Sequence, residues 1–341
     1  MSWLTLAEEQ TVASFSIRFG NEPGLSPGDV QDLALLAEEV GYEALWMTEG
    51  SGRDSVTQLT SVAGKTQRIW LGTGILPIFG RTPLNTAMCA AGAAAVSNGR
   101  FMLGLGVGNR SAVETSHGVP YNRPVTRLRE TITIVRRLLQ GEEVDYQGRV
   151  FNVNQASLGG AAPPEKVPIY IAALGPRMLE LAGEMADGVL LSWTGPSSVK
   201  SAIELVQQAA ARAGRDPSQV KIAGYVRTSV ASDQEAAHAS LRGQIARYTH
   251  NAYYRTFFRQ SGFQKEMDEA EQALERGDDA GAVSAISPRM EKELGVIGTP
   301  SECREMLGEI QSMGLQQLVV APLPVGDPRE CYRETISALG G

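Results

Sequence analysis

The feature that most constrains the fold is the regular alternation of short apolar stretches with amphipathic stretches along the 341 residues. Several apolar stretches carry no polar residue on either face, such as FMLGLGV, VPIYIAA and LVVAPL. Strands that are apolar on both faces are typical of parallel sheets covered by helices. Eight strands are predicted, at residues 15–19, 44–48, 69–76, 101–107, 168–173, 188–193, 221–230 and 317–323.

The segments between these strands have the spacing of amphipathic helices. Val30, Leu33, Ala37 and Val40 recur on one helical face, and Gly41 ends that run. Eight strand–helix units in succession predict an α/β fold, a closed (β/α)8 TIM barrel formed by one domain over residues 1–341. An open, doubly wound sheet is the alternative.

Two segments are too long for simple connections and are interpreted as insertions after the fourth and seventh strands. The first, residues 109–166, contains a helix and the hairpin-like stretch VDYQGRVFNV, with a turn expected at Gln147–Gly148. The second, residues 232–300, is acidic, helical in pattern and rich in Ala, Gln and Glu. Insertions in a barrel commonly carry function, so both are expected to roof the active site.

Composition excludes several classes of protein. The formal charge of −7 argues against a nucleic-acid partner, which needs a basic face. The three cysteines and three histidines form no metal-binding pattern, so no metal is expected. No apolar run is long enough for a membrane span, and the N-terminus lacks a signal-peptide pattern, so a cytoplasmic protein is expected.

The active site of a barrel lies where its strands end, and three consecutive strands end here in glycine-rich segments. These segments are GTGILP, GLGVGN and AALGPRM. Glycine in a strand suits close approach by another backbone or a ligand, although each segment alone is equally typical of a turn. The three together favour a flat ligand lying over the barrel mouth.

The segment AALGPRM also predicts a phosphate site. Gly175 can leave the strand freely and Pro176 suits the first helical position. The unpaired amides of that first turn would then face the barrel mouth and attract an anion. Arg177 either adds charge there or lies in solvent.

Five longer stretches carry a family resemblance: LAEEVGYEALWMTEG, RIWLGTGILPIFGRTP, GRFMLGLGVGN, RPVTRLRETITIVRRLLQGEEVDYQGRVF and VPIYIAALGPRMLELAGEMADGVLL. They resemble the luciferase-like superfamily, and within it the deazaflavin (coenzyme F-420) branch that includes methylenetetrahydromethanopterin reductase. The resemblance implies a cis non-prolyl peptide at Gly74–Ile75 behind the cofactor ring, and a phosphate held by residues 175–178. The cofactor-binding residues expected on this basis are Thr48, Gly74, Ile75, Gly106, Gly108, Asn109, Ala173, Gly175, Pro176, Arg177, Met178 and Ser192.

The chain departs from this family where acid–base groups are expected. Relatives commonly place an Asp-His pair after the second strand, and the matching residues here are Glu49 and Gly50. Relatives also have a glutamate after the Gly-x-Gly of strand four, where this chain has Asn109. The dehydrogenases of this family use that histidine as their base, so its absence puts a sugar-phosphate alcohol dehydrogenase in doubt. Both departures together imply a site with fewer acid–base groups than those of the relatives.

The remaining catalytic candidates are Glu49 and His117, with Glu114 beside the latter. Glu49 is either a proton donor or a carboxylate paired with Arg53 or another arginine. His117 is either a general acid or an exposed loop residue. Aromatic residues that could shape a substrate pocket, or simply fill the core, are Trp46, Phe79 and Trp193.

The resemblance implies an F-420-dependent oxidoreductase that moves a hydride between its cofactor and a small organic substrate. The alternative is a two-component monooxygenase that uses reduced FMN, and a third possibility is a flavin carrier without chemistry. A homodimer through the second and third helices is expected, because residues 88–96 (MCAAGAAAV) are small and apolar. A separate reductase that regenerates the reduced cofactor is a further expected partner.

Overall fold

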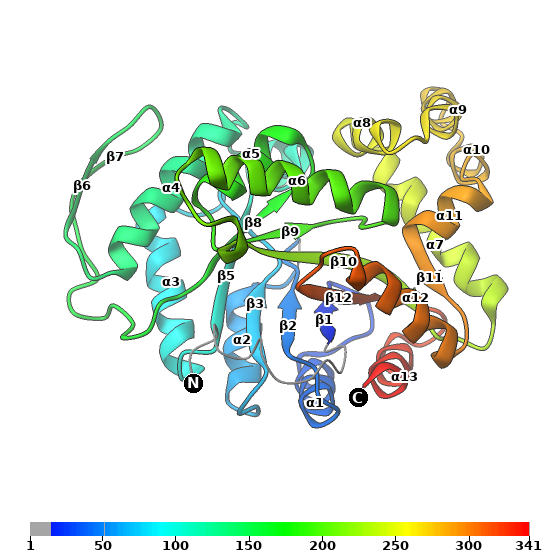
Figure 1. Ribbon diagram of the computed structural model, residues 1–341, viewed down its shortest axis with the longest axis horizontal. Helices are drawn as coiled ribbons and strands as arrows, with labels where there is room; N and C mark the ends of the chain where they lie inside the picture. The colour runs from blue at the N-terminus through cyan, green and yellow to red at the C-terminus, as the bar shows by residue number, and fades with distance from the viewer. Residues whose placement is uncertain (1–14, 51, 341) are drawn as a thin grey trace.

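Eight parallel strands close into a barrel in the computed structural model, which describes residues 15–50 and 52–340. Each strand pairs with the next, and β12 pairs with β1 through Phe15 and Leu318 to complete the ring (Figure 1). The barrel strands are β1 (Phe15–Phe19), β2 (Ala44–Met47), β3 (Trp70–Thr73), β5 (Phe101–Gly106), β8 (Ile169–Ala173), β9 (Gly188–Leu191), β10 (Lys221–Ser229) and β12 (Gln317–Pro322). The predicted closed barrel is confirmed, and the open-sheet alternative is wrong.

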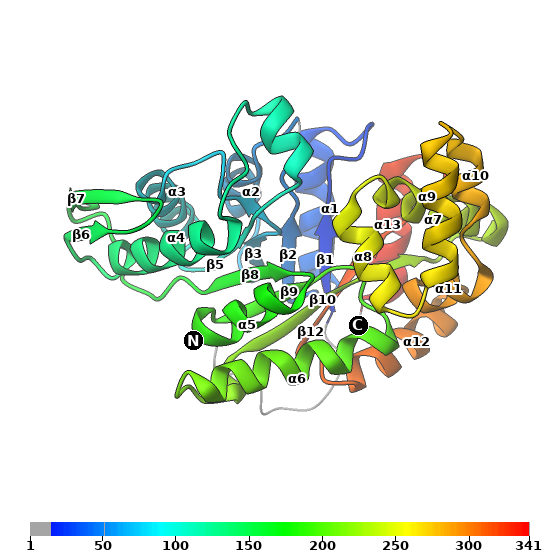
Figure 2. The same ribbon diagram turned by 90° about the horizontal axis from the view of Figure 1, so that it is seen from above.

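Helices surround the barrel, as Figures 1 and 2 show. Most begin with a proline in the first turn after a polar cap, such as Ser26 and Thr82, whose side chains accept a hydrogen bond from a helix amide. They are α1 (Pro27–Glu39), α2 (Ser55–Ala63), α3 (Pro83–Val96), α4 (Pro124–Leu139), α5 (Pro176–Met185), α6 (Pro196–Arg212), the short helix η3 (Pro217–Gln219), α12 (Pro300–Ser312) and α13 (Pro328–Leu339). None of the helices in the described part of the chain has the length and apolar character needed to cross a membrane.

The third barrel strand is interrupted, where the sequence predicted one continuous strand. β3 ends at Thr73, and a two-residue strand β4 (Leu76–Pro77) resumes the pairing with β5. The Gly74–Ile75 peptide bond between them is cis, at the position that the family resemblance implied. This bulge turns Ile75 toward the end of the barrel where the strands finish.

The first insertion lies mostly away from the barrel mouth. After β5 the chain forms the π-helix η2 (Ala112–Ser116), then α4, and only then the hairpin of β6 (Val144–Gln147) and β7 (Asn152–Ala156). The hairpin therefore emerges where β8 begins, and the carboxylate of Glu130 on α4 fixes it by accepting the amides of residues 149–151. The expectation that this whole insertion roofs the site is wrong, because only residues 107–123 adjoin the strand ends.

The expected turn of this hairpin is also shifted. Gln147 pairs with Asn152, so the connection comprises residues 148–151 rather than Gln147–Gly148.

The second insertion does stand over the strand ends. It contains α7 (Gln234–Thr249), α8 (Ala252–Gln260), α9 (Gln264–Glu275), α10 (Asp279–Ser284), α11 (Pro288–Leu294) and the short strand β11 (Gly295–Ile297). These helices have their own apolar core around Phe258, Phe263 and Met267, and Trp193 after β9 belongs to it. Both views show them gathered at the opposite end of the molecule from the β6–β7 hairpin (Figures 1 and 2).

Candidate active site

Side chains fill the inside of the barrel and leave no room for a Cβ atom at several of its glycines. Trp46 and Tyr170 pack edge to face with ring centroids 5.0 Å apart. A Cβ atom at Gly72 would lie 2.4 Å from the Trp46 ring, and one at Gly74 would lie 1.9 Å from the Tyr225 hydroxyl. The interpretation that these glycines make room for a ligand is therefore wrong for both positions, because the protein's own aromatic rings occupy that room.

Above this filling, the barrel ends in an apolar surface. A Cβ atom at Gly106 would lie 2.8 Å from the Ile75 side chain and 3.4 Å from the Ala172 Cβ, so residues of three successive strands meet there. Ile75 and Ala172 are only partly buried and lie on top of the interior cluster. An apolar surface of this kind at the strand ends suits packing against one face of a ring system.

The α5 N-terminus has an open approach beside this surface. A Cβ atom at Gly175 would have no neighbouring heavy atom within 4 Å. Pro176 occupies the first helical position, and the amides of Met178 and Leu179 both point back to the Gly175 carbonyl, at 3.0 and 3.1 Å. Arg177 is exposed. The arrangement fits an anionic group approaching the first turn of the helix.

A small cavity adjoins this turn. Ala173 and Ser192 line it together with Leu174 and Phe257, and its volume is about 20 Å³, room for roughly one water molecule. Ser192 hydrogen-bonds with the side chain of Tyr254, so α8 covers this side of the α5 N-terminus.

The candidates after β5 lie at the solvent edge. Gly108 has a positive φ of 67°, which favours glycine, and the Asn109 Oδ1 accepts the Ser111 amide at 2.8 Å. Glu114 pairs with Arg110 at 3.1 Å, and both are exposed. His117 is an exposed residue that ends the π-helix.

Glu49 is held by partners on both carboxylate oxygens. Its Oε1 lies 2.5 Å from Arg81 Nη1, and its Oε2 accepts the Ser55 amide and hydroxyl at 3.0 and 2.8 Å. Arg81 also pairs with Asp54, the cap of α2. The arginine partner is therefore Arg81 and not Arg53, whose guanidinium donates to the Leu25 carbonyl.

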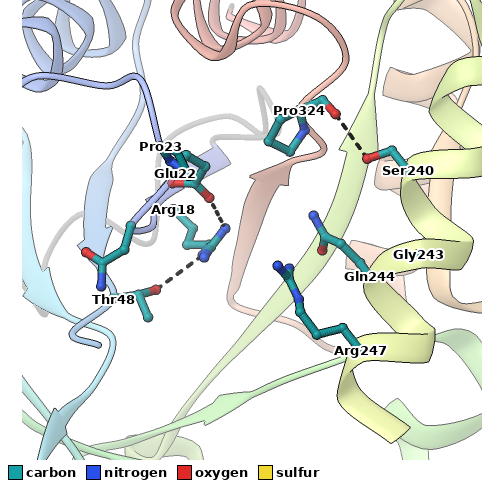
Figure 3. A pocket seen from close by; sticks show the side chains of 10 residues that line it. Arg18, Glu22, Pro23, Thr48, Ser240, Gly243, Gln244, Arg247 and Pro324 are labelled. Atoms are coloured by element: carbon teal, nitrogen blue, oxygen red, sulfur yellow. Dashed lines mark hydrogen bonds and ion pairs between the residues drawn. The ribbon is translucent and has the colours of Figure 1, made fainter. Parts of the chain in front are cut away.

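A cavity opens between the ends of β1, β2 and β12 on one side and α7 on the other (Figure 3). Its volume is about 500 Å³, and Thr48 is the one expected site residue in its lining. Arg18 on β1 donates to the Thr48 hydroxyl at 3.2 Å and to Glu22 at 2.9 Å. The other lining residues are Asn21, Pro23, Ser240, Gly243, Gln244, Arg247 and Pro324.

A second arginine lies buried near this cavity. Arg227 on β10 is 6% exposed, and its guanidinium carbon lies 3.9 Å from the ring centroid of Trp193 and 5.8 Å from that of Tyr248. No carboxylate among the described residues pairs with it, and its Nη1 has no hydrogen-bond acceptor there. The aromatic rings and a side-chain hydrogen bond with Tyr248 compensate its charge.

Burial raises the pKa of the Tyr248 hydroxyl, but the positive charges of Arg227, Arg18 and Arg247 outweigh it, so the pKa lies below its ordinary value of 10. Tyr248 is half-buried and packs edge to face on Trp193 with centroids 5.0 Å apart. It is therefore an acidic hydroxyl beside the barrel mouth.

Sequence reasoning missed Arg18, Arg227, Arg247 and Tyr248. For the first two a signal existed, since each is the one charged residue in a short segment without other charges that was predicted to be a strand, FSIRF and YVRTS. Such a charge is buried only when it is paired or functional. The two residues on α7 carry no comparable signal, because the insertion has no recognisable motif. Of the aromatic residues considered, Trp46 and Phe79 lie in the core and Trp193 supports Arg227.

A closed parallel barrel with a cis peptide in its interrupted third strand, an apolar rim and an open helix N-terminus defines a (β/α)8 protein whose candidate ligand site lies at the carboxyl ends of its strands. The family model described as luciferase-like monooxygenase matches residues 10–317. The chain belongs to this luciferase-like family, as the sequence indicated.

The chain is similar to reductases that use coenzyme F420. It is 30% identical over 331 residues to 5,10-methylenetetrahydromethanopterin reductase from Archaeoglobus fulgidus, covering 95% of this chain and 98% of the relative. The same enzyme from Methanolobus tindarius is 31% identical over 299 residues, covering 87% and 90%. The solved structure of the coenzyme F420-dependent tetrahydromethanopterin reductase from Methanopyrus kandleri superimposes with a TM-score of 0.79 at 26% identity, covering 96% and 97%.

Proposed function

We propose that this chain is an F420-dependent oxidoreductase that transfers a hydride between the bound deazaflavin and a small organic substrate. The observation that carries the proposal is the continuous rim formed by Ile75, Gly106 and Ala172, which ends at the open N-terminus of α5. The relatives named above, which the chain matches over nearly its whole length, are F420-dependent enzymes or reductases of the same kind. When bound in its reduced form, F420 supplies the hydride.

The protein's contribution is to hold the ring and the phosphate. Ile75 and Gly106 support one face of the ring, and Gly74 places the bulge behind it. The amide and the charge of Arg177 bind the phosphate, since Pro176 has no amide hydrogen and the amides of Met178 and Leu179 donate to the Gly175 carbonyl. The full set assigned to the cofactor is Thr48, Gly74, Ile75, Gly106, Gly108, Asn109, Ala173, Gly175, Pro176, Arg177, Met178 and Ser192.

A proton must accompany the hydride, and three residues are candidates for donating it. Glu49 has both oxygens engaged by Arg81 and Ser55, and His117 lies exposed in the loop after β5. Tyr248 is not part of the cavity lining but follows Arg247, which is, and its pKa is lowered. We favour Tyr248, because nearby positive charges stabilise its conjugate base and it adjoins a residue of the cavity.

Titration of the apo-protein with F420 and, separately, with FMN tests this function. We expect F420 to bind more tightly and the reduced form to be consumed anaerobically when a substrate is reduced. The alternative is a reduced-FMN monooxygenase, because the matching family is described as luciferase-like monooxygenase. Tighter binding of reduced FMN, with product formed only in the presence of oxygen, would establish that alternative and overturn the proposal.

The same proposal includes the setting in which the enzyme works. It acts on a small molecule, as one domain over residues 1–341, in the cytoplasm and as a homodimer. A separate reductase regenerates its reduced cofactor. Neither nucleic acid nor a membrane is among its partners.

A further inference from the structure

The cavity between β1 and α7 lies across the barrel from the α5 N-terminus. Around the ring of eight strands, the order from β1 is β2, β3, β5 and then β8, so β8 is four positions from β1 in either direction and lies opposite it. A cofactor anchored after β8 with its ring on Ile75 would therefore point its ring toward β1. The cavity of about 500 Å³ beyond it is within the usual range for small organic ligands, roughly 300–1,000 Å³.

The lining of this cavity is cationic. Arg247 on α7 is exposed to it and has no ion-pair partner among the residues that the structure describes. Figure 3 shows the side chains of Arg247 and Gln244 directed from α7 toward the side where Arg18 and Thr48 lie. Glu22 is the only acidic residue in the described lining, and it is already paired with Arg18.

The buried Arg227 adds to this imbalance. Its charge acts on Arg18 and Tyr248, so it belongs to the same cluster of charges. A buried cation without a carboxylate is costly, and a cluster of cations is stabilised when an anion enters. Three arginines and one glutamate give the cluster a net positive charge. Within the residues that the structure describes, no further acidic group neutralises this charge.

We propose that the cavity binds the anionic group of the substrate, a carboxylate or a phosphate, with Arg247 as its principal contact and Arg18 and Gln244 beside it. The substrate class follows as a small organic acid or phosphate ester whose reducible carbon extends toward the cofactor ring. Arginine suits this task, because its planar fork matches both groups. The assignment of a substrate rests on the proposed function, whereas anion binding itself does not.

Calorimetric titration of the full chain tests the proposal with three probes: succinate, its uncharged analogue succinamide, and inorganic phosphate. We expect one or both anions to bind, and succinamide not to bind. Succinate alone would identify a carboxylate site and phosphate alone a phosphate site. Equal binding of succinamide and succinate, or binding of neither anion, would overturn the proposal.

Arg247→Gln is the decisive variant, because its exposed side chain has no partner whose loss would disturb the fold. Anion affinity should fall roughly tenfold or more, the effect of losing one hydrogen bond to a charged group. Arg212→Gln is the matched control, since Arg212 is an exposed arginine on α6 outside the cavity lining. Unchanged affinity in Arg247→Gln, or an equal loss in Arg212→Gln, would refute the assignment.

F420 titration of the same variants separates this proposal from the proposed function. Arg247→Gln should bind F420 as the unchanged protein does. If F420 affinity falls together with anion affinity, the cavity belongs to the cofactor and the substrate assignment is wrong. If anions bind as expected but F420 does not, the proposed function fails and the anion site stands.

Discussion

The pKa of Tyr248 is subject to two opposing effects, burial and nearby positive charge. Arg227 lies 5.8 Å from the centre of its ring, and Arg18 and Arg247 add further positive charge. These charges stabilise the phenolate more than burial disfavours it, so the phenolate forms below the ordinary pKa of 10.

Ultraviolet difference titration should therefore detect one tyrosine that ionises below the others. Tyr248→Phe should remove this early transition, and Arg227→Gln should move it to higher pH, because a stabilising charge is lost. Since a donor works only while protonated, the rate of substrate reduction should fall as pH rises through the Tyr248 pKa. Tyr253→Phe is the control, because Tyr253 is 58% exposed. An identical early transition in Tyr248→Phe would contradict the assignment.

Gly175 and Gly106 offer a matched pair of glycines on the proposed cofactor site. Gly175 has an extended φ of −113° and free space for a Cβ, so Gly175→Ala should fold normally. The added methyl narrows the approach to the helix amides, and F420 affinity should fall about tenfold, the effect of one charge-assisted hydrogen bond. The measurement is a fluorescence titration with F420. Unaltered affinity would show that the phosphate lies elsewhere.

Gly106→Ala should behave differently. Its Cβ would meet the Ile75 side chain at 2.8 Å, so overpacking should cost roughly 1–3 kcal/mol of unfolding free energy. Chemical denaturation of the two variants shows whether the substitution lowers the free energy of unfolding, as expected for Gly106→Ala, or leaves it unchanged while cofactor affinity falls, as expected for Gly175→Ala.

At the scale of elements, the pattern of apolar residues was sufficient to predict the barrel strands but not the structure of the insertions. The strand at residues 15–19 begins at the first residue that the structure describes and ends where it was predicted to end, because Gly20 follows it. The predicted strand at 69–76 divides at Gly74–Ile75, since the run is uniformly apolar and periodicity cannot mark a bulge. β11 was not predicted, because three residues pairing with β10 give no periodic signal.

Glu38 connects two elements through its carboxylate. It lies at the end of α1 and accepts the amides of Gln67, Arg68 and Ile69 at 2.6–3.0 Å, just before β3 begins. Glu38→Ala leaves the buried Ile69 amide and the amides of the exposed Gln67 and Arg68 without this acceptor, and it should lower the free energy of unfolding by roughly 1–3 kcal/mol. Glu39→Ala, at the exposed neighbouring residue, should change it little. Thermal denaturation of both variants checks the difference.

The same carboxylate should make stability depend on pH. Burial raises the pKa of Glu38, but the three amides lower it more, so the folded-state pKa lies below the ordinary value of 4.5. Its contribution is therefore complete above about 4.5 and is lost as pH falls through the lowered pKa. Denaturation across acidic pH should show a shallower loss of stability in Glu38→Gln. Identical slopes in the two proteins would disprove this contribution.

At the scale of the molecule, the candidate site combines parts that sequence can and cannot identify. Strand ends and the α5 terminus were placed correctly, because a barrel brings all strand ends to one rim. The cationic cavity was not foreseen, because it depends on α7 folding back over β1 and β12, and Arg247 lies far from Arg18 in the sequence. Local patterns determine elements, but they do not determine how an insertion packs.

The surface of α3 supports the last prediction, a homodimer. Ala87, Ala90, Ala91 and Ala94 pack inward on the barrel, whereas Met88 and Val96 are 56% and 54% exposed on the other face. Two large apolar side chains on a helix of small residues suit close packing against a second copy.

Light scattering should therefore give twice the chain mass of 36.5 kDa. Met88→Glu with Val96→Lys should give monomers, because charged groups would be buried without partners. Met313→Lys, at an exposed apolar residue after α12, should remain dimeric. A monomeric mass for the unchanged protein at micromolar concentration would exclude this interface, while leaving the site within each chain intact.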